Sequence, residues 1–177
     1  SVRAGNVIGG GDWAPNRIIP DFFRAYFNQK KMIIRNPNSV RPWQHVLDAL
    51  NGYLVLAKKL HNNKKISGES FNFGPAKVKN FKIKNLINYL NKEESIKKNY
   101  IKIKKNNKLI ETNILKLNVN KLKKKLNWTT LLDVKKSLDF TKDWYFKFNP
   151  KNFNYNLELS KSQIRKFNKL KYNVEKN

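Results

Sequence analysis

The sequence predicts a folded chain of the α/β class, and two observations carry this prediction. Short segments of small, apolar and β-branched residues alternate along the chain with longer segments in which apolar residues recur at helical spacing. Four Trp, seven Tyr and eleven Phe provide enough large side chains for a packed core. At 177 residues, the chain has the length of one domain.

The first forty residues are expected to form a strand, a helix and a second strand. A run of small and β-branched residues opens the chain, and three consecutive glycines end it. Pro20 falls in the first turn of the helix that follows, where a missing N–H costs little. The expected elements are a buried strand over Ser1–Ile8, a helix over Arg17–Asn28, a short strand over Met32–Arg35 and a turn at Asn36–Asn38.

The clearest helix in the sequence covers Val46–Leu60. Asp48 lies near its start, and Lys58 and Lys59 lie near its end, as the helix macrodipole favours. Apolar residues recur on one face at helical spacing, so we expect that face to be buried. The residues of this face are Val46, Leu50, Tyr53, Leu54, Ala57 and Leu60.

The remaining elements continue the alternation. Asn127 is expected to take a left-handed conformation at the end of a lysine-rich helix, with Trp128 packing back onto the core. The signal weakens after Pro150, so we expect residues 150–177 to form a peripheral C-terminal tail. The expected elements are strands at Ser70–Phe73 and Tyr100–Ile103, and helices at Phe81–Leu90, Leu117–Leu126, Asp133–Phe148 and Leu159–Phe167.

The formal net charge of +26 is typical of a nucleic-acid-binding protein, but three features argue against that interpretation. Lys supplies 32 of the 38 cations, whereas surfaces that contact phosphates and bases commonly use Arg as well. Lys and Asn together make up a third of the chain, which is the usage of an AT-rich genome. Residues 76–177 hold 27 of the 38 cations, away from the residues that look functional. We therefore expect a solvated basic surface, and an anionic partner is the alternative.

The chain contains no Cys, which excludes disulfides and thiolate metal sites and fits a reducing compartment. Two His and twelve scattered carboxylates form no legible metal-ligand cluster, and no Ser-His-Asp arrangement is apparent. No apolar run approaches the roughly 18 residues of a membrane span, and no signal peptide opens the chain. We expect a cytoplasmic protein with no membrane partner. Because the chain opens without Met inside an expected strand, we also expect a fragment whose N-terminal part is absent.

The segment Gly9-Gly10-Gly11 has two possible interpretations. It lacks the spaced glycines of a dinucleotide fingerprint, so it is either a turn that ends a strand or a loop whose backbone lies close to a ligand. Asn6 also has two readings, because a buried amide needs hydrogen-bond partners. These partners are either backbone groups or a ligand at the end of the strand, where open α/β sheets bind.

Arginine is scarce in this chain, with six Arg against 32 Lys. A retained Arg therefore indicates a site that needs a planar, two-pronged donor for phosphate or carboxylate. We expect a phosphate role for Arg41, which Val40 and Pro42 hold rigid, and for Arg17 at a helix start. Arg35 ends a strand and is more typical of a structural pair. His45 lies at a helix start and is more typical of a structural hydrogen bond than of a base or a ligand.

These residues together resemble the C-terminal half of the CDP-glucose 4,6-dehydratases. Those enzymes are extended short-chain dehydrogenases/reductases of the NAD-dependent epimerase/dehydratase superfamily. The resemblance is densest from Arg3 to Leu60, and it thins further along the chain. The motifs are R-A-G-N-V-I-G-G-G-D-W-A at Arg3–Ala14, R-I-I-P-D at Arg17–Asp21, R-N-P-N-S-V-R-P-W-Q-H-V-L at Arg35–Leu47, G-Y-L-V-L-A at Gly52–Ala57 and F-N-F-G-P at Phe71–Pro75.

The resemblance implies a Rossmann-type fold and an NAD-dependent hydro-lyase. Such enzymes use NAD to oxidise C4 of CDP-glucose, eliminate water across C5 and C6, and reduce C6, giving CDP-4-keto-6-deoxyglucose for polysaccharide biosynthesis. They bind NAD through an N-terminal G-x-x-G-x-x-G segment and act through a Tyr-x-x-x-Lys pair. Both features lie before the strand that matches Ser1–Ile8, so we assign no catalytic residue and no cofactor-binding residue in this chain.

The same resemblance implies a single partial domain over residues 1–177, made of the end of the Rossmann sheet and the smaller substrate-binding subdomain. The chain would supply the pocket for the CDP-sugar and would be inactive alone. A homodimer or a homotetramer is implied for the whole protein. The substrate-binding residues that the resemblance assigns are Asn6, Arg17, Ile18, Pro20, Ile34, Arg41, Asn72 and Glu111.

Two alternatives stay open. The first is another nucleotide-sugar dehydratase or epimerase of the same superfamily. The second is a basic nucleic-acid-binding module in residues 76–177, which would need Phe81, Tyr100 and Trp128 exposed for base stacking.

Overall fold

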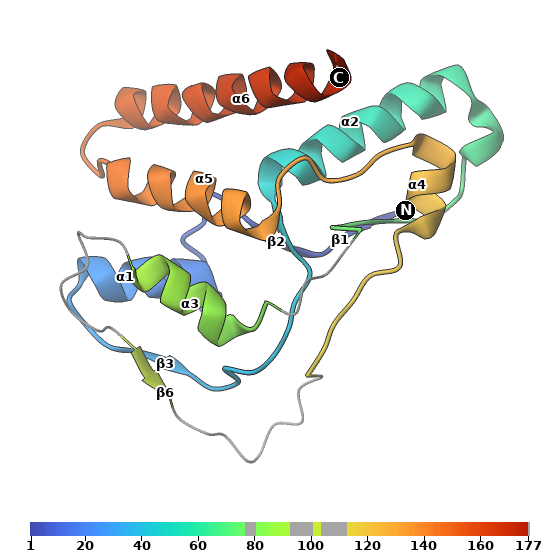
Figure 1. Ribbon diagram of the computed structural model, residues 1–177. Helices are drawn as coiled ribbons and strands as arrows, with labels where there is room; N and C mark the ends of the chain where they lie inside the picture. Colours follow the sequence, from blue (N-terminus) through green and yellow to red (C-terminus); the bar gives the residue numbers. More distant parts are fainter. Residues whose placement is uncertain (77–80, 93–100, 104–112, 177) are drawn as a thin grey trace. The chain divides into compact units, whose positions relative to one another are not determined.

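The computed structural model describes residues 1–76, 81–92, 101–103 and 113–176 (Figure 1). The chain forms two compact units. Unit 1 comprises Ser1–Gly10, Pro42–Lys77 and Leu117–Asn177, and unit 2 comprises Gly11–Arg41 and Val78–Lys116. Each unit has its own strands and helices. The single partial domain that the sequence analysis expects over residues 1–177 stays a prediction.

The opening strand of unit 1 is two strands rather than one. β1 (Val2–Ala4) pairs in parallel with β5 (Phe71–Phe73), and β2 (Asn6–Ile8) pairs in parallel with β4 (Trp43–His45). The change of partner occurs at Gly5, whose N–H donates to the carbonyl of Phe73 over 3.0 Å. A Cβ on Gly5 would lie 2.6 Å from the carbonyl oxygen of Pro42, so only glycine fits between the two pairs.

The expected burial of this opening segment is wrong for part of its length. Val2 is 43% exposed and Val7 is 37% exposed, although Ile8 is buried. The physical reason is pairing: within the described residues, each of these strands has one partner strand, so one edge is not covered by a further strand.

Helix α2 (Val46–Asn62) has nearly the expected bounds, but its predicted buried face is only partly right: Tyr53 and Leu60 pack against a core cluster, and other residues of that face do not. Leu50 and Leu54 are 49% and 71% exposed. The buried residues are instead Asp48, Ala49, Gly52 and Leu56. Gly52 explains the difference, because a Cβ there would lie 2.5 Å from the Phe73 ring. The helix therefore approaches the β1–β5 pair through its smallest residue.

The corner after α4 (Asn120–Leu126) confirms the sequence prediction. Asn127 adopts the left-handed conformation, with φ 48° and ψ 37°, and its N–H donates to the carbonyl of Lys123. Trp128 then turns back into a core cluster, where its ring centroid lies 5.2 Å from that of Phe73. The short helix η1 (Lys64–Ile66) adds Ile66 to the same cluster.

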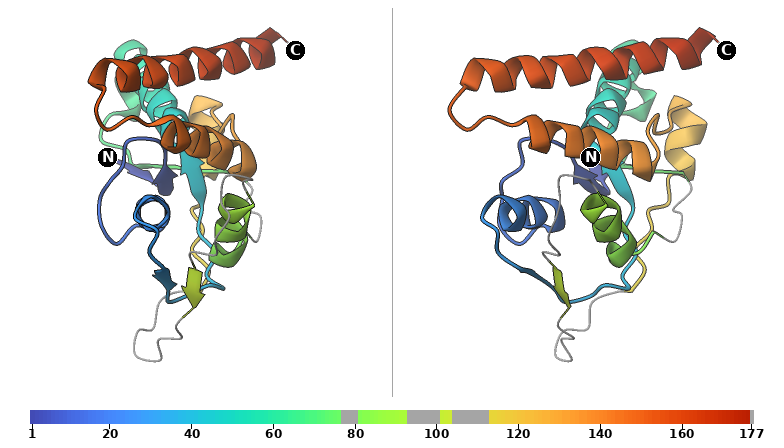
Figure 2. Two further views of the ribbon diagram at one scale, coloured as in Figure 1. Left: turned by 90° about the vertical axis from the view of Figure 1, so that its left-hand side faces the viewer. Right: turned by 60° about the vertical axis from the view of Figure 1, so that its left-hand side comes forward.

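The last two helices are α5 (Val134–Lys147) and α6 (Phe153–Lys176). α5 begins where expected, with the Asp133 side chain accepting from the N–H of Lys136. α6 is much longer than the expected Leu159–Phe167, and it lies along α5 in Figure 1 and in both views of Figure 2. Gln163 donates to the carbonyl of Phe140 over 2.6 Å, and Phe167 is 3% exposed. The expected tail is thus largely one helix, which belongs to unit 1 and packs against α5.

Unit 2 contains α1 (Ile18–Phe27), β3 (Met32–Ile34), α3 (Ile83–Asn91) and β6 (Ile101–Ile103). β3 and β6 pair in parallel, and the predicted turn closes with the N–H of Ser39 donating to the carbonyl of Asn36. Val40 forms bridges with both Lys82 and Ile114, which holds the segment leading to Arg41 in place. Each of these elements lies within a few residues of its predicted bounds. Among the described residues, no helix combines the length and the hydropathy that a membrane span requires.

Candidate functional site

The three glycines after β2 are accounted for by packing and backbone conformation. A Cβ on Gly9 would lie 2.6 Å from Cγ1 of Val46, and a Cβ on Gly10 would lie 2.0 Å from Cγ of Trp144. Gly11 has φ +83°, which favours glycine. These contacts support the interpretation of a strand-ending turn. They explain why glycine is required at each position without a bound ligand.

Asn6 is half-buried at the start of β2, directly after the carboxyl end of β1. Within the described part of the chain, its side-chain amide has no hydrogen-bond partner. The backbone partners that one reading requires are therefore not seen, and the amide can serve a ligand at this edge. Asn72 differs, because its Nδ2 donates to the carbonyl of Asn118 over 3.2 Å. That bond explains Asn72 without a ligand.

Arg17 lies at the N-cap of α1, with 64% of its side chain exposed. It makes no side-chain cap, and one guanidinium nitrogen donates to Oδ2 of Asp12 over 2.9 Å. The first-turn N–H groups and the positive end of the helix dipole lie beside this guanidinium. A helix start with an exposed arginine suits an anion such as a phosphate.

The other predicted residues of unit 2 are less accessible. Pro20 is buried in the first turn of α1, and Ile18 is half-buried. Ile34 is 4% exposed, while its neighbour Ile33 is 54% exposed. The surface of β3 that could meet a nucleobase in this structure is therefore that of Ile33.

Arg41 is 8% exposed, and it donates to the carbonyl of Val40 over 3.0 Å. The bridges of Val40 keep this stretch of backbone in place, as the neighbouring Pro42 indicated. Arg41 is the residue at which the chain passes from unit 2 to unit 1.

The structure brings some of the predicted residues together. Arg17, Ile18 and Pro20 gather at the start of α1 in unit 2, whereas Asn6 and Asn72 belong to unit 1. Glu111 lies outside the described residues. A shared pocket for Asn6, Arg17 and Arg41 stays a prediction.

Arg24 was missed at the level of sequence, although the scarcity of arginine was the signal that could have found it. From α1, its guanidinium donates to the carbonyl oxygens of Trp13 and Ala14, over 2.5 and 3.2 Å, and it pairs with Asp21. It thus holds the loop that leads to Arg17.

His45 and Asp48 are the buried titratable groups at the start of α2. Burial lowers the pKa of His45 to about 4, and its Nδ1 accepts from the N–H of Leu47 over 3.2 Å. This is the structural hydrogen bond that the sequence predicts. Burial raises the pKa of Asp48 to about 6, although the N–H groups of Leu131 and Leu132, which donate to its carboxylate over 2.6 and 3.2 Å, act to lower the pKa. Both groups lie inside the fold: His45 caps the start of α2, and Asp48 ties α2 to the segment at Leu131 and Leu132.

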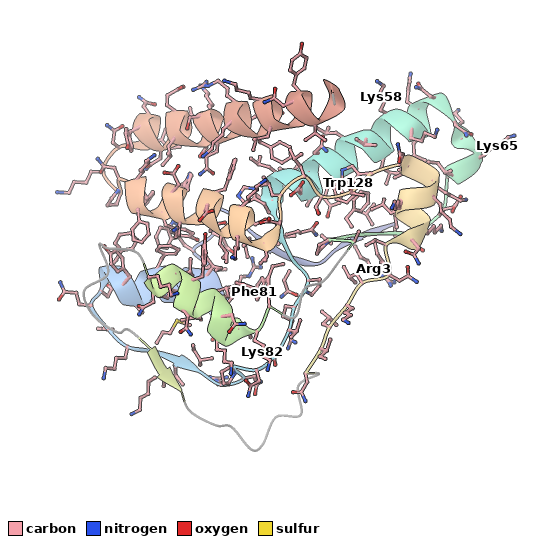
Figure 3. All side chains as sticks on the ribbon, in the orientation of Figure 1. Arg3, Lys58, Lys65, Phe81, Lys82 and Trp128 are labelled. Carbon is pink, nitrogen blue, oxygen red and sulfur yellow. The ribbon has the colours of Figure 1, made fainter. Side chains whose placement is uncertain are left out.

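The burial of Trp128 argues against the nucleic-acid alternative, which requires this ring to be exposed. Trp128 is 5% exposed, packed between α2 and α4, so its ring cannot stack on a base (Figure 3). Phe81 is half-buried, and Tyr100 lies outside the described residues. Among the residues that the structure describes, no group of three or more His, Cys, Asp and Glu is placed to hold a metal ion.

Comparison with solved structures identifies the fold. The dTDP-glucose 4,6-dehydratase of Bacillus anthracis in complex with NAD matches with a TM-score of 0.65 at 20% identity, over 82% of this chain and 44% of that one. The UDP-glucuronic acid 4-epimerase of Bacillus cereus, in complex with UDP-glucuronic acid and NAD, gives 0.67 at 19% identity, over 82% and 44%. An epimerase of Methanothermobacter thermautotrophicus gives 0.68 at 18% identity, over 89% and 44%. The fold is therefore that of the extended, Rossmann-type short-chain dehydrogenases/reductases, as predicted.

The sequence comparison is more specific. Over 75 residues the chain is 59% identical to the CDP-glucose 4,6-dehydratase of Salmonella typhimurium, which confirms the predicted resemblance. The match covers 42% of this chain and 21% of that protein. The chain also spans less than half the length of each of the three solved structures. No protein-family model matches the chain.

Proposed function

We propose that this chain is the nucleotide-sugar-binding part of a CDP-glucose 4,6-dehydratase. The observation that carries the proposal is the 59% identity over 75 residues with an enzyme of that name. Other nucleotide-sugar dehydratases and epimerases share the fold, but the three solved structures compared above are 18–20% identical to this chain. The CDP-sugar is therefore the preferred substrate class.

Each unit has a role in this proposal. Unit 1 is the end of the Rossmann sheet and offers Asn6 at the carboxyl edge of β1, where such sheets bind ligands. Unit 2 is the substrate-binding subdomain and offers the uncapped start of α1 with Arg17. Arg17 and Arg41 bind the diphosphate, because guanidinium groups can donate two parallel hydrogen bonds to it. Asn6 contacts the sugar side of the ligand, and the β3 surface contacts the base. Glu111 lies outside the described residues and belongs to the site only through the sequence resemblance.

NAD is the cofactor that the proposal implies. The glycine turn after β2 does not fit it, because Gly9 and Gly10 are filled by Val46 and Trp144 rather than open to a pyrophosphate. We therefore propose that NAD is bound by residues other than 1–177, and we derive no step through it. The part of the reaction assigned to this chain is to bind and orient the CDP-sugar. A homodimer or a homotetramer is the expected assembly of the whole protein.

A chimera tests the proposal. In it, residues 1–177 replace the corresponding C-terminal part of the Salmonella typhimurium enzyme, so that the matched relative supplies the cofactor-binding half. We expect the chimera to convert CDP-glucose, and we expect residues 1–177 alone to give no turnover. The matched control is the same chimera with Arg41→Lys. A chimera that folds and binds NAD, yet prefers dTDP-glucose or UDP-glucose, would contradict the assignment to CDP-glucose.

A further inference from the structure

The loop Gly11–Arg17, which leads into α1, has a conformation of its own. We call it the α1 loop. Gly11 and Asn16 both have positive φ, at +83° and +62°. Oδ1 of Asp12 accepts from the N–H of Ala14 over 3.0 Å, which makes a tight side-chain-to-backbone turn. These contacts all lie within unit 2, so they do not depend on the placement of the two units.

Arg24 fastens this loop to the helix. One terminal nitrogen donates to the carbonyl of Trp13 over 2.5 Å, and the other donates to the carbonyl of Ala14 over 3.2 Å and pairs with Asp21. The planar guanidinium can serve these three acceptors at once, whereas a lysine ammonium on a flexible stem cannot match the same fork. The ring of Trp13 also lies 6.1 Å from that of Phe27, which adds an apolar contact between loop and helix.

The fixed part of the loop is connected to Arg17. Asp12, which holds Ala14 through one carboxylate oxygen, holds the guanidinium of Arg17 through the other over 2.9 Å. A chain of contacts therefore runs from Arg24 through Ala14 and Asp12 to Arg17. Arg24 lies behind the loop, with 32% of its side chain exposed, while 64% of the Arg17 side chain is open to solvent.

We propose that Arg24 is a positioning residue for the nucleoside diphosphate of the substrate. It fixes the α1 loop, so that Arg17 and the start of α1 are already in place when the phosphates arrive. Ordering a loop on binding costs free energy, and a loop that is ordered beforehand avoids this cost. The effect of Arg24 is therefore on ligand affinity more than on fold stability. This inference rests on the proposed function of Arg17.

The first test needs no nucleotide. Hydrogen exchange of the backbone amides of Gly11–Arg17 is measured in the whole protein, as wild type and as Arg24→Lys. We expect faster exchange in the loop of the variant and unchanged exchange in the last two turns of α1. Arg165→Lys is the matched control, because Arg165 also lies on a helix and pairs with a carboxylate, Glu158, but it belongs to α6 in unit 1 rather than to the unit that holds the α1 loop. Equal loop exchange in wild type and Arg24→Lys would overturn the proposal.

The second test measures the affinity of the same proteins for CDP by calorimetry. We expect Arg24→Lys to weaken CDP binding about tenfold, and Arg165→Lys to leave it unchanged. Asp21→Asn removes the carboxylate that Arg24 pairs with but keeps both carbonyl contacts, so it should keep CDP affinity within about twofold of wild type. If Asp21→Asn weakens binding as much as Arg24→Lys does, Arg24 acts through the helix and the proposal is overturned.

The CDP measurements distinguish a wrong role for Arg24 from a wrong proposed function. If the wild type binds CDP and Arg24→Lys binds it equally well, the positioning role is wrong while the proposed function stands. If the wild type binds no CDP, the proposed function is wrong and the positioning role falls with it. At saturating substrate, kcat of Arg24→Lys should equal that of the wild type, because a positioning residue for the phosphates changes KM. A loss confined to kcat would overturn the proposal.

Discussion

Arginine is used sparingly in this chain, and the structure gives three of the six arginines distinct surroundings. Arg17 is largely exposed at a helix start, Arg24 is half-buried behind a loop, and Arg41 is buried where the chain passes between the units. Scarcity of Arg in a lysine-rich sequence therefore points to positions where a planar fork has a use that an ammonium cannot serve. The sequence argument named Arg17 and Arg41. It did not name Arg24, for which scarcity was the one available signal, because the carbonyl groups that Arg24 contacts cannot be located from the sequence.

Arg41→Lys tests the diphosphate role directly. We expect CDP binding in the whole protein to weaken by on the order of 1–3 kcal/mol, because a point charge does not replace two parallel N–H donors. Calorimetry with CDP measures the change. Arg35→Lys, at the exposed end of β3, is the control and should bind CDP normally. Unchanged affinity in Arg41→Lys would remove Arg41 from the site.

The buried pair at the start of α2 predicts opposite pH effects on stability. The pKa of folded Asp48 is raised to about 6, so its ionisation costs stability, which falls as the pH rises from about 4 to about 6. The pKa of folded His45 is lowered to about 4, so the unfolded chain binds more protons and stability rises from about pH 4 to about 6.5. Each contribution is at most roughly 3 kcal/mol, and the two largely cancel.

Replacing one of the two residues should reveal the pH dependence of stability that the other one contributes. In Asp48→Asn the free energy of unfolding should rise with pH between about 4 and 6.5 more steeply than in the wild type. Urea denaturation of wild type and variant at several pH values measures the difference. His45→Asn is the matched variant and should show the opposite slope. Identical pH profiles for the wild type and Asp48→Asn would contradict the raised pKa.

At the scale of elements, most helices and strands could be predicted, but their buried faces could not always be. α2 was placed within two residues, yet Leu50 and Leu54 face solvent while Gly52 faces Phe73. Periodicity locates apolar residues, but a close approach between a helix and a strand is made through small ones. The split of the opening strand at Gly5 is of the same kind, because it depends on a carbonyl of Pro42 that is distant in sequence.

For α6, the sequence predicts a helix that is too short. Its sequence is polar and lysine-rich, so we expected only a short helix there, whereas the helix in the structure is 24 residues long. Tertiary contacts through Leu159, Gln163 and Phe167 stabilise it against α5, and helical periodicity in such a polar segment is a weak signal.

Gly10→Ala tests the packing of the glycine turn on α5. A methyl group at Gly10 would lie 2.0 Å from Cγ of Trp144, so Trp144 must move. We expect a loss of roughly 1–3 kcal/mol in the free energy of unfolding, the usual effect of overpacking. Gly74→Ala is the matched control, because its nearest atom would lie at 3.4 Å, an ordinary contact. Thermal or urea denaturation compares the two, and equal stability of the two variants would show that Gly10 is not packed as described.

At the scale of the whole molecule, the candidate site is divided between the units. Asn6 belongs to unit 1, and Arg17 belongs to unit 2. The sequence resemblance assigned both residues to one ligand, and the separate geometry of each unit is compatible with that assignment. No property of either unit alone determines whether the two meet, which is why the shared pocket rests on the similarity to a CDP-glucose 4,6-dehydratase.

The most direct measurement is an experimental structure of the whole protein with CDP-glucose bound. The account predicts that Asn6, Arg17 and Arg41 contact one ligand molecule, with both arginines on the diphosphate and the asparagine toward the sugar. A ligand bound elsewhere, with these three residues on separate surfaces, would contradict it.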